Sequence, residues 1–212
     1  MFAPRSGGPL AAEGAVLTVS GAILLLHLLP LVPEFYLALV GVWGAAFAFW
    51  LFLIAFFRDP NRTIGGGIVS AADGRVREVR EVGPELLISV FMNVTDVHVN
   101  RVPLDGTFTR VQDAGSGRRP AYRPDADRNV ARTYEMTTAF GPVRIVQITG
   151  ILAGRLVSFV TSGATLAKGD RFGMIVLGSR VDVFLPASRV GATVRVGDRV
   201  HAGSTTIAQE RT

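Results

Sequence analysis

Charged side chains are nearly absent from the first part of the chain and common in the remainder. Residues 1–57 contain only three of them: Arg5, Glu13 and Glu34. Two apolar stretches lie in this part, at 14–32 and 35–57. In a helix that rises about 1.5 Å per residue, the stretch 35–57 is long enough to cross a hydrocarbon core of about 30 Å. The first stretch is shorter and carries His27. We expect it to span as well, and whether it crosses the bilayer fully stays open. The pattern excludes a wholly soluble globule as the leading interpretation and predicts an N-terminal two-helix transmembrane anchor at 1–57.

Proline and arginine positions indicate the topology of this anchor. Pro30 lies near the end of the first stretch, and Pro33 and Glu34 lie between the two; together they predict the turn of a helical hairpin. A cleaved signal peptide fits less well, because the basic start is weak and the apolar segment follows almost at once. Arg58 and Arg62 follow the second stretch, and positive residues mark the cytoplasmic side of a membrane. We therefore expect a protein of the cell (inner) membrane whose polar domain faces the cytoplasm.

Residues 58–212 carry short apolar runs separated by turns, and their length suits one compact domain. The candidate strands are 75–79, 86–92, 97–99, 107–111, 131–138, 143–149, 155–161, 174–177, 180–184 and 193–196. Their spacing and their content of Val, Ile, Phe and Thr predict a mainly β domain, an antiparallel sandwich or barrel-like fold without a long amphipathic helix. Gly-Asp (GD) turns occur at 168–173 and 197–203. We interpret them as structural turns rather than as the lysine-bearing tip of a lipoyl or biotin carrier.

Composition narrows the chemistry of this domain. The chain has no cysteine, which excludes disulfides, thiol catalysis and zinc–thiolate sites, and we expect no metal. The net charge of +5 in a membrane-tethered domain favours lipid headgroups over nucleic acid as a partner, and no nucleic-acid-binding motif supports the latter. The segment 113–128 holds four arginines and no apolar periodicity, which predicts an exposed loop. Its arginines either contact anionic headgroups or are simply solvated.

Serine, histidine and aspartate remain as candidate catalytic groups. Ser179 follows Gly178 in a tight turn between two apolar runs, where glycine lets an attacking oxygen approach the backbone. Most Gly-Ser turns only connect the two strands of a hairpin and have no catalytic role. His98 lies in the strand-rich core of the domain, where an isolated histidine is more often structural than catalytic. Asp73 stands in an Ala-Asp-Gly sequence that by itself predicts a turn.

Several segments taken together carry a family resemblance. They occur in the order FFRDPNR at 56–62, ADG at 72–74, VHVNRVP at 97–103, KGDRFG at 168–173 and LGSR at 177–180. From about Phe56 to the C-terminus the chain resembles the short bacterial and archaeal form of phosphatidylserine decarboxylase. Several motifs in a fixed order are far more specific than any one of them.

The resemblance implies a proenzyme that cuts itself. In that family the serine of the Gly-Ser pair attacks the preceding carbonyl, and elimination and hydrolysis leave a covalently bound pyruvoyl group. Carried onto this chain, the cut falls between Gly178 and Ser179 and gives a heterodimer of chains 1–178 and 179–212. The pyruvoyl group derived from Ser179 then forms a Schiff base with the amine of the phospholipid substrate in the bilayer. Decarboxylation converts phosphatidylserine to phosphatidylethanolamine and CO2.

The resemblance also suggests roles for the candidate residues. His98 would be the general base and acid, with Asp73 orienting it as in other Ser-His-Asp triads. Longer members of the family have a second histidine where this chain has Arg101, so His98 serves both steps, or Arg101 or water takes one of them. Asn100 and Arg101 are the candidates for binding substrate. Phosphatidylserine and archaetidylserine share the same headgroup chemistry, and both remain open as substrates.

A non-enzymatic interpretation competes with this one. A helical hairpin can also carry an OB-like β-barrel that acts as a membrane-anchored binding module. Such a protein would stay one intact chain, and its Asp73, His98 and Ser179 would have no reason to converge.

Overall fold

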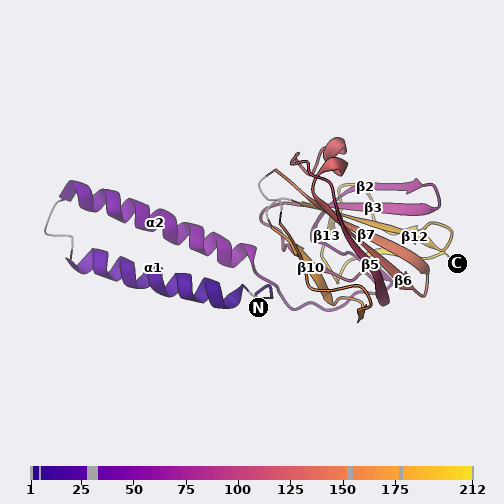
Figure 1. Ribbon diagram of the computed structural model, residues 1–212, viewed down its shortest axis with the longest axis horizontal. Coiled ribbons are helices and arrows are strands. Elements are labelled where there is room, and N and C mark those ends of the chain that lie inside the picture. Colours follow the sequence, from indigo (N-terminus) through magenta and orange to yellow (C-terminus); the bar gives the residue numbers. More distant parts are fainter. Residues whose placement is uncertain (1, 5, 28–32, 152–154, 177–178, 212) are drawn as a thin grey trace. The chain divides into compact units, whose positions relative to one another are not determined.

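The computed structural model describes residues 2–4, 6–27, 33–151, 155–176 and 179–211. The chain divides into two compact units, Met1–Pro60 and Asn61–Thr212 (Figure 1). The division lies near the position where charged residues return in the sequence. The first unit is helical and the second is built from strands.

The first unit consists of two apolar helices, α1 (Gly7–His27) and α2 (Pro33–Phe56), which pack against each other. Both are long and apolar enough to cross a membrane, with mean hydropathies of 1.3 over 7–24 and 2.3 over 37–56. Helix α1 begins earlier than the predicted span 14–32. Proline fits the first turn of a helix, so Pro33 and the residue after it open α2 instead of forming the predicted turn. Pro30, the other predicted turn residue, lies outside the described residues.

Two tryptophans of α2 lie over two glycines of α1. The indole nitrogens of Trp43 and Trp50 donate to main-chain carbonyls of α1 at 2.7 and 2.8 Å. A Cβ atom at Gly21 would lie 2.4 Å from the ring of Trp43, and one at Gly14 would lie 2.2 Å from that of Trp50. The glycines therefore let the helices approach closely, and the two polar indole groups are satisfied within an apolar hairpin.

The second unit confirms the predicted mainly β class. Its strands are β1 (Ile68–Val69), β2 (Gly74–Val82), β3 (Glu85–Met92), β4 (Val99–Arg101), β5 (Gly106–Ala114), β6 (Ala131–Thr138), β7 (Gly141–Thr149), β8 (Leu156–Ser158), β9 (Thr165–Leu166), β10 (Arg171–Ile175), β11 (Ser179–Pro186), β12 (Val190–Ala192), β13 (Arg199–Val200) and β14 (Thr206–Glu210). They form an antiparallel sheet in the order β13-β2-β3-β11-β7-β6-β5-β9 and two smaller sheets, β1-β14-β12 and β4-β10-β8.

Some predicted elements differ from the observed ones. The predicted strand 193–196 is absent, because the carboxylate of Asp198 accepts from the amide of Arg195 at 2.8 Å and closes a turn there. The strand predicted at 97–99 is displaced to β4. Within the predicted loop 113–128 lies a short 3-10 helix, η1 (Pro124–Arg128), which begins at a proline.

The last part of the chain occupies the centre of the larger sheet and also contributes to its edge. Strand β11 lies between β3 and β7 and pairs with both along most of its length. Strand β13 extends the same sheet beside β2, and β12 and β14 complete the sheet of β1. Residues 179–212 therefore cannot leave this fold without exposing its core.

Candidate active site

Ser179 is the first residue of the central strand β11 and is fully buried. Its backbone pairs with Met92 of β3 on one side and with Thr149 of β7 on the other. Its hydroxyl oxygen lies 3.4 Å from the sulfur of Met92. A strand held on both sides fixes the position of this serine. Gly178, the other half of the predicted cleavage site, lies outside the described residues.

His98 is also fully buried, one residue before β4. Its Nδ1 lies 2.9 Å from the main-chain oxygen of Asp96. A carbonyl oxygen can only accept, so Nδ1 carries the proton and Nε2 holds the lone pair of a general base. The main-chain oxygen of His98 accepts from the amide of Ile175 at 3.3 Å, which ties His98 to the strand that leads towards Ser179.

A hydrogen-bond network of buried polar side chains leads from the core toward Ser179. The amide nitrogen of Asn100 faces the sulfur of Met92 at 3.7 Å, and its amide oxygen accepts from Gln147 at 2.7 Å. The amide oxygen of Gln147 in turn accepts from the hydroxyl of Tyr134 at 3.0 Å. Burial raises the pKa of Tyr134, which keeps that hydroxyl protonated as a donor. These hydrogen bonds thus fix the Asn100 amide with its N–H groups toward the sulfur of Met92, which Ser179 also contacts.

Gly173 makes room for this hydrogen-bond network. A Cβ atom at this position of β10 would lie 3.0 Å from the amide nitrogen of Gln147 and 3.2 Å from the hydroxyl of Tyr134. It would also lie 2.8 Å from the main-chain oxygen of Val157. The last glycine of the segment KGDRFG is therefore explained by the close approach of polar side chains from the larger sheet.

Arg101 points away from Asn100, since neighbouring residues of a strand alternate between its faces. Its guanidinium donates to the main-chain oxygen of Gly169 at 3.0 Å, within the first GD turn. Its own amide donates to the oxygen of Ala71 at 2.9 Å. The described contacts of Arg101 thus join β4 to two turns.

Asp73 is buried immediately before β2 and holds three groups. Its carboxylate lies 2.7 Å from the guanidinium of Arg62 and 3.4 Å from Nδ1 of His201, and it accepts from the amide of Ala202 at 2.8 Å. His98 is not among these partners. The sequence associated Asp73 with His98, whereas the structure brings it to His201 because β2 pairs with β13. The described contact that orients His98 is the one to the Asp96 carbonyl.

Comparison with known proteins decides the family. The family model described as phosphatidylserine decarboxylase matches residues 49–208. The chain is 38% identical over 205 residues to the phosphatidylserine decarboxylase proenzyme of Carboxydothermus hydrogenoformans, covering 92% of this chain and 90% of the relative. It is 42% identical over 180 residues to that of Aromatoleum aromaticum, covering 78% and 83%. A protein of Methanococcoides burtonii, provisionally named an archaetidylserine decarboxylase proenzyme, is 40% identical over 163 residues, covering 76% of each chain.

The chain belongs to the phosphatidylserine decarboxylase family. This confirms the resemblance drawn from the ordered segments, and it makes the protein a decarboxylase. The alternative of a non-enzymatic binding module is wrong.

The structure also brings together residues that the sequence did not single out. Met92, Tyr134 and Gln147 lie on three different strands. In the folded chain Met92 and Gln147 contact Asn100, and Tyr134 contacts Gln147. One signal was present, because Gln147 is a polar residue inside the apolar run VRIVQIT of β7. A buried glutamine in such a run needs hydrogen-bond partners, and here Asn100 and Tyr134 supply them.

Proposed function

We propose that this chain cuts itself between Gly178 and Ser179 and then decarboxylates phosphatidylserine to phosphatidylethanolamine and CO2. The observation that carries the proposal is the burial of Ser179 at the start of a central strand. His98, with the lone pair on Nε2, is attached through its backbone to the strand that leads into Ser179. A serine hydroxyl is a weak nucleophile and needs such a base.

In the proposed cut, the hydroxyl oxygen of Ser179 attacks the carbonyl carbon of Gly178 while His98 takes its proton. The peptide C–N bond breaks, an ester C–O bond forms, and the amine nitrogen of Ser179 is protonated. Elimination across the Cα–Cβ bond of Ser179 then releases the carboxylate of chain 1–178. Hydrolysis of the resulting dehydroalanine releases ammonia and leaves the pyruvoyl group as the first residue of chain 179–212.

The buried surroundings of residue 179 fit this group, which is made from the serine itself and needs no separate binding site. The pyruvoyl group supplies a carbonyl that condenses with the substrate amine as a Schiff base and takes up the electrons left by CO2. His98 returns a proton to the carbon that loses CO2. The side-chain N–H groups of Asn100 and the hydroxyl of Ser179 both face the sulfur of Met92. In the proposed reaction these N–H groups bind the substrate or its developing negative charge. Arg101 remains a candidate for substrate binding.

The two apolar helices support a membrane lipid as substrate and the bilayer as partner. We propose the cell (inner) membrane as the location, with the catalytic domain on the cytoplasmic side. Arg58 and Arg62 follow α2, and basic residues favour that side.

The proposed chains 1–178 and 179–212 remain together as a heterodimer. Strand β11 of the short chain would still pair with β3 and β7 of the long one. Asp96 and Asp73 of the long chain also contact Arg199 and His201 of the short one.

Purified full-length protein tests the proposal directly. Denaturing gel electrophoresis with intact-mass measurement should show two chains, the shorter with a pyruvoyl group in place of Ser179. The same preparation should release CO2 from phosphatidylserine vesicles and form phosphatidylethanolamine; vesicles of archaetidylserine determine whether the lipid backbone matters. One uncut 22.6 kDa chain that nevertheless decarboxylates phosphatidylserine would contradict the proposed mechanism.

Replacing Gln147 with glutamate tests the role of the hydrogen-bond network of Tyr134, Gln147 and Asn100. An ionised carboxylate at this position cannot donate to the Asn100 oxygen, so the amide of Asn100 turns and presents its oxygen toward residue 179. We expect decarboxylation to fall about tenfold or more, since one preorganised donor is lost. Burial raises the pKa of a carboxylic acid, and its protonated form can again donate, so the deficit of Gln147→Glu should shrink as the pH is lowered. The exposed Gln112→Glu on β5 is the matched control, with unchanged activity; an equal loss in both variants would contradict the role.

A further inference from the structure

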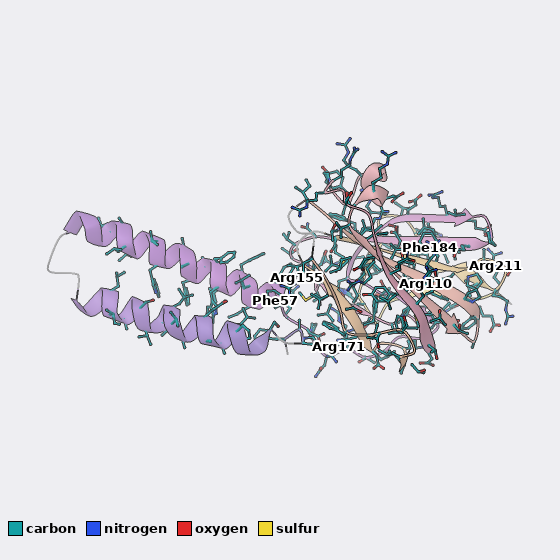
Figure 2. All side chains as sticks on the ribbon, in the orientation of Figure 1. Phe57, Arg110, Arg155, Arg171, Phe184 and Arg211 are labelled. Carbon is teal, nitrogen blue, oxygen red and sulfur yellow. The ribbon has the colours of Figure 1, made fainter. Side chains whose placement is uncertain are left out.

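The two faces of β11 have different surroundings. Ser179 and the alternate residues after it face the core, whereas Arg180, Asp182 and Phe184 face the other way. On that opposite side they line a cavity of about 700 Å³. Phe184 is labelled in Figure 2. The residue next to Ser179 therefore lies on the side of the sheet away from the proposed chemistry.

Arg180 is held there by two carboxylates. Its guanidinium lies 2.9 Å from Oδ2 of Asp182, and it also pairs with Asp127 of η1. The other carboxylate oxygen of Asp182 accepts from the hydroxyl of Ser89 on β3 at 2.5 Å. The side chains of Arg180 and Asp182 are only 11% and 6% exposed, whereas Asp127 is 71% exposed. Burial raises the pKa of Asp182, and the guanidinium of Arg180 acts against that rise.

These four residues fall on both sides of the proposed cut. Ser89 and Asp127 belong to 1–178, and Arg180 and Asp182 belong to 179–212. Before the cut, a peptide bond holds the start of β11. After it, residue 179 is a chain end, and chain ends fray unless side chains or pairing hold them. Arg180 is then the second residue of the new chain and the first with a side chain bound to the long chain.

We propose that Arg180 and Asp182, bound to Asp127 and Ser89, hold residue 179 in its reactive position after the chain is cut. This rests on the proposed function. The four residues are here called the clamp. Through Arg180 and Asp182, the side chains of Asp127 and Ser89 hold β11 on the face that the reaction does not use. The other face is left for the substrate and for His98. They are positioning residues, since they act through residue 179 and do not touch the reacting atoms.

The test replaces the two clamp residues that belong to β11 in the full chain, with Arg180→Met and Asp182→Leu together. Removing one partner alone would leave a buried charge, whereas replacing a buried pair by apolar residues of similar size is often tolerated by a fold. The matched control is Arg211→Met with Glu81→Leu, an exposed pair at 2.7 Å that also joins residues 1–178 to residues 179–212. Arg211 is labelled in Figure 2. Both double variants should be cut as completely as the wild type.

We expect the clamp variant to lose about tenfold to a hundredfold in kcat with little change in KM, since a small misplacement of a reacting group has effects of this size. Hydrogen exchange measured by mass spectrometry should show faster exchange at the start of 179–186 in the cut clamp variant. The same double replacement made in the uncut Ser179→Ala chain should leave that exchange close to its reference. The control pair should leave kcat and exchange unchanged.

Asp127→Asn provides a second variant at an exposed carboxylate, where misfolding is not expected. It should raise exchange at the start of β11 by a smaller amount in the same direction. Unchanged exchange and kcat in the clamp variants would overturn the proposal, and so would a clamp variant that is not cut, because the clamp would then act before the cut. A wild-type chain that is not cut would instead overturn the proposed function itself.

Discussion

Replacing Ser179 with alanine is expected to leave a single uncut chain without decarboxylase activity. Alanine lacks the hydroxyl oxygen that forms the ester, and it cannot give rise to a pyruvoyl group. The expected loss of decarboxylation is at least about 10⁴-fold, the scale seen when a catalytic nucleophile is removed. Denaturing gels and intact masses report the cut, and CO2 release from phosphatidylserine vesicles reports the activity.

The fold should survive this change. The Ser179 side chain makes one weak described hydrogen bond, to the Met92 sulfur, while its backbone pairs with β3 and β7 remain. A melting temperature close to the wild-type value is therefore expected. Ser204→Ala is the control, because the Ser204 hydroxyl donates to Thr63 at 2.9 Å in a turn outside the proposed site. Normal cutting of Ser179→Ala would show that another residue supplies the nucleophile.

The helical and the strand-forming parts of the chain were predictable because each follows a local pattern. Charge-free stretches long enough to span a bilayer predicted the helices, and short apolar runs with glycine turns predicted most of the strands. Local patterns were insufficient at 193–196, where a single aspartate turn replaces the expected strand. They were also insufficient at Pro33, which opens α2 rather than ending a turn.

The candidate site was predictable only where the residues lie in recognisable segments. Ser179 and His98 stand in such segments, and the structure buries both of them. The surroundings that orient them come from distant strands. Met92 and Gln147 reach Asn100 through pairing across the sheets, and Asp73 meets His201 because β13 pairs with β2. No local pattern encodes these meetings, since they depend on the register of long-range pairing.

The burial of the site connects its architecture to its chemistry. Ser179, His98 and Asn100 are all fully buried. A buried carbonyl at position 179 would be protected from water, and hydrogen bonds to it are stronger in such surroundings. Under the proposed function, the substrate headgroup must nevertheless reach residue 179. A firm hold from the opposite face of β11 would allow groups on the reactive face to move without displacing it.

Replacing His98 with alanine is expected to slow the cut by about 10² to 10⁴-fold, the usual contribution of a positioned general base. His98 is fully buried, so the variant leaves a space of the size of the imidazole ring. Added imidazole should enter that space and restore part of the cutting rate, which loss of structure would not permit. Time courses of the two chains on denaturing gels, with and without imidazole, measure both effects.

The same variant separates the two steps assigned to His98. Chains of His98→Ala that have been cut slowly in imidazole can be freed of it and assayed for decarboxylation. Activity close to the wild-type level would show that Arg101 or water supplies the proton in the second step, whereas low activity restored by imidazole would assign both steps to His98. His201→Ala should keep the cut, since its exposed ring reaches Asp73 at 3.4 Å rather than a residue of the proposed reaction. If His201→Ala stopped the cut while His98→Ala did not, the base would be the histidine that Asp73 contacts.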